Sequence, residues 1–128
     1  AERDALQVVD DQVGAPTGAD LLADVTAHAL RALLRDGAPG GTYHVAAAGE
    51  TSWHGYARFV IESARALGEP IRVAPEAVHA VPSSAFPTPA RRPHNSRLDT
   101  RRLQSTFGLR LPPWQDGVAR WLTEVLAR

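Results

Sequence analysis

The sequence of 128 residues contains no cysteine, no methionine and no lysine. Without cysteine, disulfides and thiolate metal sites are excluded. Since all 14 basic residues are arginine, the chain cannot carry out a mechanism that needs a lysine ammonium, such as a P-loop, a Schiff base or a tyrosine–lysine pair. Without methionine there is no translation start, so we expect a fragment, a processed product or a trimmed version of a longer chain.

Long apolar runs and an excess of one charge are also absent. No stretch approaches the roughly 20 apolar residues that span a bilayer, and no signal peptide opens the chain. Fourteen arginines balance fourteen acidic residues, which gives no electrostatic reason to expect nucleic acid or an anionic membrane as partner. We therefore expect neither partner, and the cytoplasm is the default compartment.

The composition is that of one ordinary globular domain, with 44% hydrophobic and 22% charged residues. Hydrophobic periodicity predicts an α/β fold rich in helices, with two or three short strands and about four helices. Strands are expected at residues 6–10, 42–45 and 71–73, and helices at 19–35, 53–67, 100–107 and 114–127. Residues 82–93 contain four prolines and should run extended and largely unpaired.

Four motifs follow one another in an order that resembles the latter part of dTDP-4-dehydrorhamnose reductases, which are extended short-chain dehydrogenases/reductases. Each motif is weak alone, but together they cover nearly the whole chain. They are Val9-Asp-Asp-Gln-Val-Gly-Ala-Pro-Thr17; Gly41-Thr-Tyr-His-Val45 with Gly49-Glu-Thr-Ser-Trp53; Val81-Pro-Ser-Ser-Ala-Phe-Pro-Thr-Pro-Ala90 with Arg92-Pro-His-Asn-Ser96; and Phe107-Gly-Leu109 with Leu111-Pro-Pro-Trp114.

The resemblance implies a Rossmann-like enzyme that transfers hydride from NAD(P)H to the C4 ketone of dTDP-4-dehydro-L-rhamnose. In that family a tyrosine donates the proton, helped by a lysine four residues later, and a glycine-rich turn holds the dinucleotide. Neither feature occurs here, since Ala47 and Val60 lie four residues after the two tyrosines. We expect residues 1–128 to be a single C-terminal substrate-binding region, inactive alone and unable to bind NAD(P)H alone, whose N-terminal dinucleotide-binding part is absent.

The loop after the first expected strand is one candidate for the dTDP-sugar site. In open α/β sheets ligands bind at the carboxyl ends of strands, and the Gln12 amide can pair with sugar hydroxyls or a carbonyl. Thr17 is a second candidate in this loop. The structural alternative is that Gly14 and Pro16 only make the turn while Thr17 caps the next helix.

The proline-rich segment is the strongest candidate. A diphosphate needs fixed positive charge, and Arg91 and Arg92 offer planar guanidinium groups in a stiff frame. By the resemblance, Arg92 matches the arginine that contacts the nucleotide diphosphate in related dehydrogenases. Phe86 could cover a base or sugar face, and Asn95 could bind the ligand or cap a turn. The alternative for Arg92 is a structural salt bridge to Asp99 or to a helix acid.

Other polar and aromatic residues support weaker hypotheses. Asp24 and His28 lie four residues apart on one expected helix, but no third metal ligand is placed. Some members of the resembled family bind a divalent ion between subunits, which would match Asp20 and Glu124 here. On the helix stripes, core packing is expected for three tryptophans, Trp53, Trp114 and Trp121.

Two alternatives to an enzyme part stay open at this point. One is a binding module that grips a dTDP-sugar without chemistry, and the other is an interaction domain that docks an apolar face on another chain. Several helices carry apolar stripes, and exposed apolar surface favours association. We therefore also expect homodimerisation or self-association of the isolated chain.

Overall fold

The computed structural model describes residues 3–90 and 92–127. In chain order the elements are β1 (Leu6–Val9), β2 (Val13–Gly14), α1 (Ala19–Arg35), β3 (Thr51–Ser52), α2 (Trp53–Ala66), η1 (Pro75–Ala77), β4 (Val78–Val81), η2 (Ser83–Ala85), α3 (Arg101–Phe107) and α4 (Trp114–Leu126), where η marks a short 3-10 turn. This is the helix-rich α/β arrangement that the periodicity predicted.

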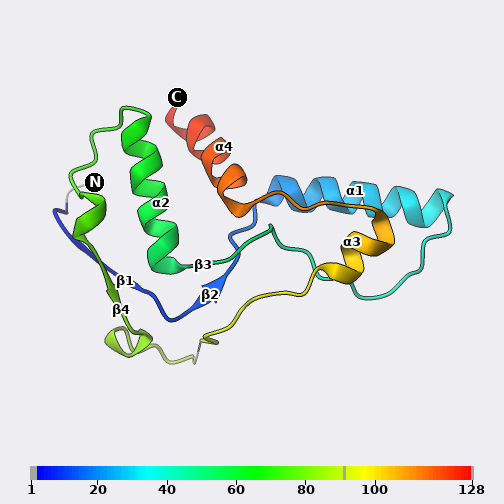
Figure 1. Ribbon diagram of the computed structural model, residues 1–128, viewed down its shortest axis with the longest axis horizontal. Helices are drawn as coiled ribbons and strands as arrows, with labels where there is room; N and C mark the ends of the chain where they lie inside the picture. The colour runs from blue at the N-terminus through cyan, green and yellow to red at the C-terminus, as the bar shows by residue number, and fades with distance from the viewer. Residues whose placement is uncertain (1–2, 91, 128) are drawn as a thin grey trace.

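Two small sheets join segments that are distant in the sequence. β1 pairs in parallel with β4, so that Leu6 lies opposite Val78 and Val9 opposite Val81. β2 pairs antiparallel with β3, and Val13 also bridges to Asn95. These pairings bring the exit of β1, the start of α2 and the proline-rich segment to one side of the molecule (Figure 1).

The core is divided into three apolar clusters. One lies between α2 and the β1–β4 pair, around Ile61, Val73 and Val78. A second lies between α2 and α4, around Trp114 and Leu122. A third joins α1 to α3, which together extend away from the other helices in Figure 1; its buried members are Val25, Leu103, Phe107 and Leu111.

Two expected strands are wrong. Residues 42–45 and 71–73 form no ladder, and the strand beside β1 is Val78–Val81, which the sequence did not predict. Their β-branched and aromatic residues pack into the core instead: the Tyr43 ring lies 4.9 Å from the Phe107 ring, and Val73 is 2% exposed. Strand-like composition identifies residues that are half buried as well as residues that are paired.

The helix ends agree better with the predictions. The Ser52 hydroxyl accepts a hydrogen bond from the Gly55 amide at 3.0 Å and so caps α2. Gly68 and Gly108 follow α2 and α3 with φ of +92° and +63°, which glycine adopts without strain. Thr17 does not cap α1, since Gly18 occupies that position.

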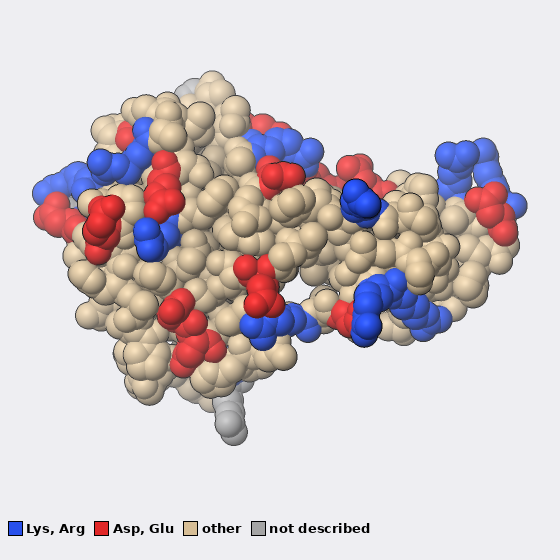
Figure 2. All heavy atoms as spheres, viewed as in Figure 1, with Lys and Arg blue, Asp and Glu red and all other residues tan. Residues whose placement is uncertain are grey.

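None of the helices in the described part of the chain is long and apolar enough to cross a membrane. On the face shown in Figure 2, basic and acidic side chains are interspersed and form no extended area of one sign. The surface on this side therefore offers no footprint for a polyanion.

Candidate functional site

The loop leaving β1 is attached to the turn that follows β4. The Asp11 carboxylate accepts two hydrogen bonds from Ser83, one from its amide at 2.9 Å and one from its hydroxyl at 2.5 Å. The Gln12 Nε2 group in turn donates to the Ser83 hydroxyl oxygen at 2.8 Å. The hydrogen bonds from Ser83 lower the pKa of Asp11 below its usual value, with the charge of His94 contributing less.

The proline-rich segment is held against the same loop. The Val13 amide donates to the His94 carbonyl, and the Ser96 amide donates to the Val13 carbonyl, both at 2.8 Å. The His94 ring donates from Nδ1 to the Asp11 carbonyl at 2.9 Å. Two segments about eighty residues apart thus form one continuous wall.

Beside this wall lies an open groove of about 840 Å³. Gln12 borders it from the β1 exit, Phe86 and Arg92 from the proline-rich segment, and Trp53 from the start of α2. The structure therefore brings three of the predicted site residues, Gln12, Phe86 and Arg92, to one groove. A cation, an aromatic face and an amide along one groove suit a ligand with a phosphate, a ring and hydroxyl groups.

Arg92 is available to a ligand. Asp99, its expected structural partner, pairs instead with Arg101 at 2.5 Å, which holds the pKa of that carboxyl well below its usual range. Within the described residues, Arg92 forms no salt bridge and its side chain is exposed. Arg91 lies outside the described residues.

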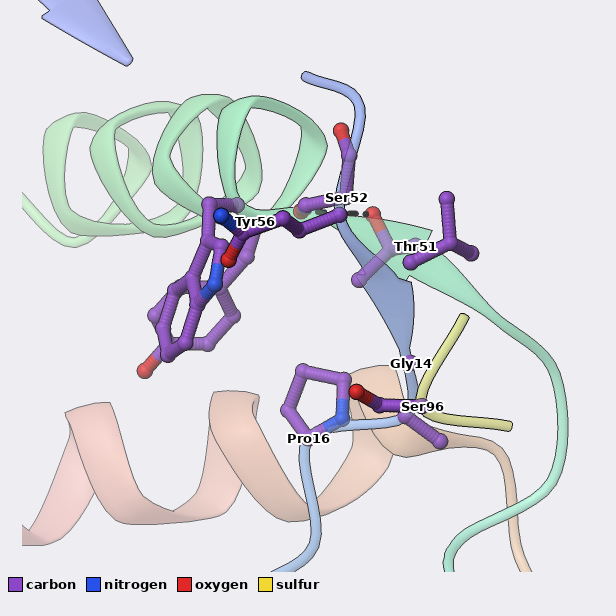
Figure 3. A pocket seen from close by; sticks show the side chains of 10 residues that line it. Gly14, Pro16, Thr51, Ser52, Tyr56 and Ser96 are labelled. Carbon is purple, nitrogen blue, oxygen red and sulfur yellow. Dashed lines mark hydrogen bonds between the residues drawn. The ribbon is translucent and has the colours of Figure 1, made fainter. Parts of the chain in front are cut away.

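A second hollow of about 380 Å³ adjoins the groove and shares Gln12, Trp53 and Ser96 with it. Figure 3 shows Pro16 and Tyr56 facing the same space, with Gly14 and Ser96 at its edge.

The exposure of the tryptophans corrects one expectation. The prediction that all three pack in the core is wrong for two of them: Trp114 is buried, but Trp53 is 58% exposed and Trp121 52% exposed. Trp53 therefore presents its ring to the groove and the adjoining hollow instead of the core.

Thr17 and Asn95 lie outside the groove and bind the protein's own backbone. The Thr17 hydroxyl donates to the Ala15 carbonyl and accepts from the Ala47 amide, so it joins the loop to the segment before β3. The Asn95 side-chain oxygen accepts from the Arg97 amide at 3.1 Å, which makes a local turn. Neither residue lines the groove, and the ligand roles expected for them stay predictions.

Comparison with known proteins decides the family. The family model described as the RmlD substrate binding domain matches residues 1–127. The chain belongs to this family. It is 54% identical over 124 residues to a dTDP-4-dehydrorhamnose reductase of Escherichia coli strain K12, covering 97% of this chain and 41% of the relative. A dTDP-4-dehydrorhamnose reductase of Burkholderia thailandensis is 42% identical, covering 99% of this chain and 44% of the relative.

Solved structures of dTDP-4-dehydrorhamnose reductases contain the same fold. A dTDP-4-dehydrorhamnose reductase from Bacillus anthracis, crystallised in complex with NADP, superposes with a TM-score of 0.80 at 29% identity, covering 96% of this chain and 39% of that chain. A Clostridium acetobutylicum dTDP-4-dehydrorhamnose reductase superposes with a TM-score of 0.76 at 28% identity, covering 98% and 40%. The chain spans about two fifths of the length of the relatives that it matches.

The acidic residues of α1 and α4 do not form a metal site by themselves. Asp20, Asp24 and Glu124 border a hollow between these helices, but the Asp20 carboxylate is paired with Arg120. Among the described residues, no group of three or more histidine, aspartate or glutamate side chains is placed to hold a metal ion. The His28 ring lies 3.1 Å from the Phe107 carbonyl, so its Nε2 atom has a structural partner.

The sequence analysis did not predict Ser83 or Trp53 at this groove. Ser83 lies 71 residues from Gln12, and nothing local to either residue indicates their hydrogen bond. Trp53 is the first residue of α2, directly after the Ser52 cap, and its side chain is exposed. The helix stripe alone led to the wrong expectation.

Proposed function

We propose that this chain forms the sugar-nucleotide-binding part of an NAD(P)H-dependent dTDP-4-dehydrorhamnose reductase, with residues 1–128 as its substrate-binding region. The observation that carries the proposal is the groove that unites Arg92, Phe86 and Gln12. The substrate is dTDP-4-dehydro-L-rhamnose, and the product of the complete enzyme is dTDP-L-rhamnose.

Each groove residue has a distinct task in this proposal. The guanidinium of Arg92 donates charge-assisted hydrogen bonds to the diphosphate, and its proline neighbours limit the entropy lost on binding. Phe86, which is 47% exposed, covers a ring of the ligand. Gln12 binds a polar group of the sugar or the base from the loop after β1, so residues of two segments hold the ligand.

The chemical step needs groups that this sequence does not contain. NAD(P)H supplies the hydride in a reductase of this kind, and the relative from Bacillus anthracis was crystallised with NADP. We propose that the dinucleotide site and the proton donor are encoded outside these 128 residues. The part played by this chain is to bind the nucleotide sugar and orient its ketone.

The binding role is tested by calorimetry with dTDP-L-rhamnose on the full product of the reading frame that carries this chain. Arg92→Ala should weaken binding by about 1.5–3 kcal/mol, because a charge-assisted contact is lost. Arg110→Ala is the matched control, since Arg110 is an exposed arginine outside the groove. Equal affinity for the wild type and the Arg92 variant would remove Arg92 from the site.

A binding module without chemistry is the second candidate. The reading frame upstream of Ala1 distinguishes the two. A glycine-rich turn followed by Tyr-x-x-x-Lys there supports the reductase, whereas a start codon next to Ala1 supports the binding module. A cytoplasmic location and a homodimer stay predictions.

A further inference from the structure

The side chains of Asp11, Ser83 and Gln12 form a short hydrogen-bonded relay beside the groove. Ser83 donates both its amide and its hydroxyl to the Asp11 carboxylate, at 2.9 and 2.5 Å. An ionised carboxylate has no proton and can only accept. The lowered pKa of Asp11 keeps it ionised at neutral pH.

The direction of the next hydrogen bond follows from the first. Because the Ser83 hydroxyl has a single proton and directs it to Asp11, its oxygen can only accept from Gln12. Gln12 must then turn Nε2 toward Ser83, as the 2.8 Å contact shows. The other end, Oε1, has no hydrogen-bond partner within residues 3–90 and 92–127 and is not buried, and Gln12 lines both the groove and the adjoining hollow.

We propose that Asp11 and Ser83 are positioning residues that fix Gln12 as a hydrogen-bond acceptor toward the groove, so that the site selects a ligand group that donates. This inference rests on the proposed nucleotide-sugar site and assigns its polarity. Three kinds of group in a thymidine diphosphate sugar supply such a donor: a hydroxyl of the rhamnose, the 3′-hydroxyl of the deoxyribose and the N3–H of the thymine.

An isosteric substitution should reverse this polarity. In Asp11→Asn the side-chain oxygen must stay opposite the Ser83 amide, because a backbone N–H cannot accept. The new Nδ2 group then donates to the Ser83 hydroxyl oxygen and frees the hydroxyl proton, which gains an acceptor when the Gln12 amide turns Oε1 toward it. We expect the Gln12 amide to turn over and to present Nε2 to the groove. Two hydrogen-bond donors, Nε2 and the ligand group, then face each other.

The test is calorimetry with dTDP-L-rhamnose on the full product of the reading frame. Asp11→Asn should weaken binding about tenfold, which is a larger loss than Gln12→Ala causes. A reversed amide sets two donors against each other, whereas a missing amide only removes one hydrogen bond. In the double variant the affinity should return to that of Gln12→Ala. A residue that acts only on folding would not produce this recovery.

Asp10→Asn is the matched control. Asp10 is the neighbouring carboxylate and contacts Ser52 and His54 instead of Ser83. Its substitution should leave the affinity unchanged. If Asp11→Asn lacks a cooperative thermal transition, Ser83→Ala takes its place: it frees the Gln12 amide to rotate, should weaken binding about threefold, and should have no effect in the Gln12→Ala background.

Two further probes identify the donor. If the donor is the thymine N3–H, dTDP alone shows the Asp11→Asn loss and N3-methyl-dTDP does not. If it is a hydroxyl of the rhamnose, dTDP binds both proteins equally and only dTDP-L-rhamnose distinguishes them. If it is the deoxyribose 3′-hydroxyl, dTDP and N3-methyl-dTDP both show the loss. An Asp11→Asn loss that persists undiminished with Gln12→Ala, or no loss at all, overturns the relay.

Failure of the relay and failure of the proposed function are distinguishable. A wild-type protein that binds dTDP-L-rhamnose, with Arg92 required but Asp11 without effect, rejects the relay and leaves the nucleotide-sugar site standing. A wild-type protein that binds neither dTDP nor dTDP-L-rhamnose rejects both.

Discussion

At the scale of single residues, two of the tryptophans show how one residue type serves two purposes in this molecule. Trp114 is buried and its ring lies 5.0 Å from that of Phe59. Trp53 stands at the rim of the groove and of the adjoining hollow, with its ring edge-on to Tyr56 at 6.2 Å. Burial, not residue type, separates a core tryptophan from one that a ligand can reach.

This difference predicts unequal effects of alanine substitution. Trp114→Ala should lower the free energy of unfolding by about 3–5 kcal/mol, because it leaves a large cavity in the core. Trp53→Ala should cost less than about 1 kcal/mol, as substitutions at exposed positions do. Urea titrations of the two variants under the same conditions check this, and equal losses would contradict the placement of Trp53.

Asp11 predicts a pH dependence of stability. Its pKa is lowered in the folded protein by Ser83, so its ionised form contributes stability above the unfolded value of about 3.9 for aspartate. The contribution is lost as the pH falls through the lowered folded pKa. We expect Asp11→Asn to be less stable than the wild type at neutral pH and the difference to shrink in acid, measured by thermal unfolding from about pH 7 to about pH 2. A difference that does not change with pH would contradict this assignment.

At the scale of elements, α2 is the helix that connects the core to the site. Its buried side packs on the β1–β4 pair through Ile61, while its first turn supplies Trp53 and Tyr56 to the hollow beside the groove. The Ser52 cap determines where this helix begins and therefore where both aromatic rings stand.

Removing the cap should destabilise this end of the molecule. Ser52→Ala leaves the Gly55 amide without its partner, and the expected loss is about 1 kcal/mol in free energy of unfolding. Ser105→Ala is the control, because Ser105 is an exposed serine within α3 and caps no helix. Hydrogen exchange at the first turn of α2 should rise only in the Ser52 variant; equal exchange in both would mean that the cap does not hold this turn.

At the scale of the whole molecule, α1 carries more apolar surface than its partners cover. Leu30 and Leu34 are 53% and 77% exposed, and Leu22 and Leu33 are more than one third exposed. The cluster beneath this helix is formed by α3 and the loops around it. Exposed leucines of this extent on one helix favour association with other apolar surfaces.

We therefore expect the isolated chain to self-associate, as the sequence predicted. Sedimentation velocity at micromolar concentration should show species larger than the monomer, and Leu30→Glu combined with Leu34→Glu should reduce them without loss of the thermal transition. The matched control is Ala23→Glu, which adds a negative charge at an exposed position of the same helix without removing a leucine. If the wild type sediments only as a monomer, the exposed leucines of α1 do not drive self-association.

The order of helices and their ends follow from the sequence alone. Apolar residues at helical spacing, the Ser52 hydroxyl and the glycines at 68 and 108 act through contacts within a few residues, so their effect can be recognised without the fold. The candidate groove residues Gln12, Phe86 and Arg92 were also predicted, because their chemistry suits a sugar diphosphate and the motifs that hold them resemble one family.

Only the tertiary structure decided which residues meet. The pairing of β1 with β4, the hydrogen bond between Gln12 and Ser83 and the exposure of Trp53 each depend on segments far apart in the chain. Such contacts depend on how separate elements pack around the core, and no local pattern of residues encodes that packing. The sequence therefore determined the helices and the chemistry of the candidate residues, and the fold determined the strand pairing, the groove and the hydrogen bond that holds Gln12.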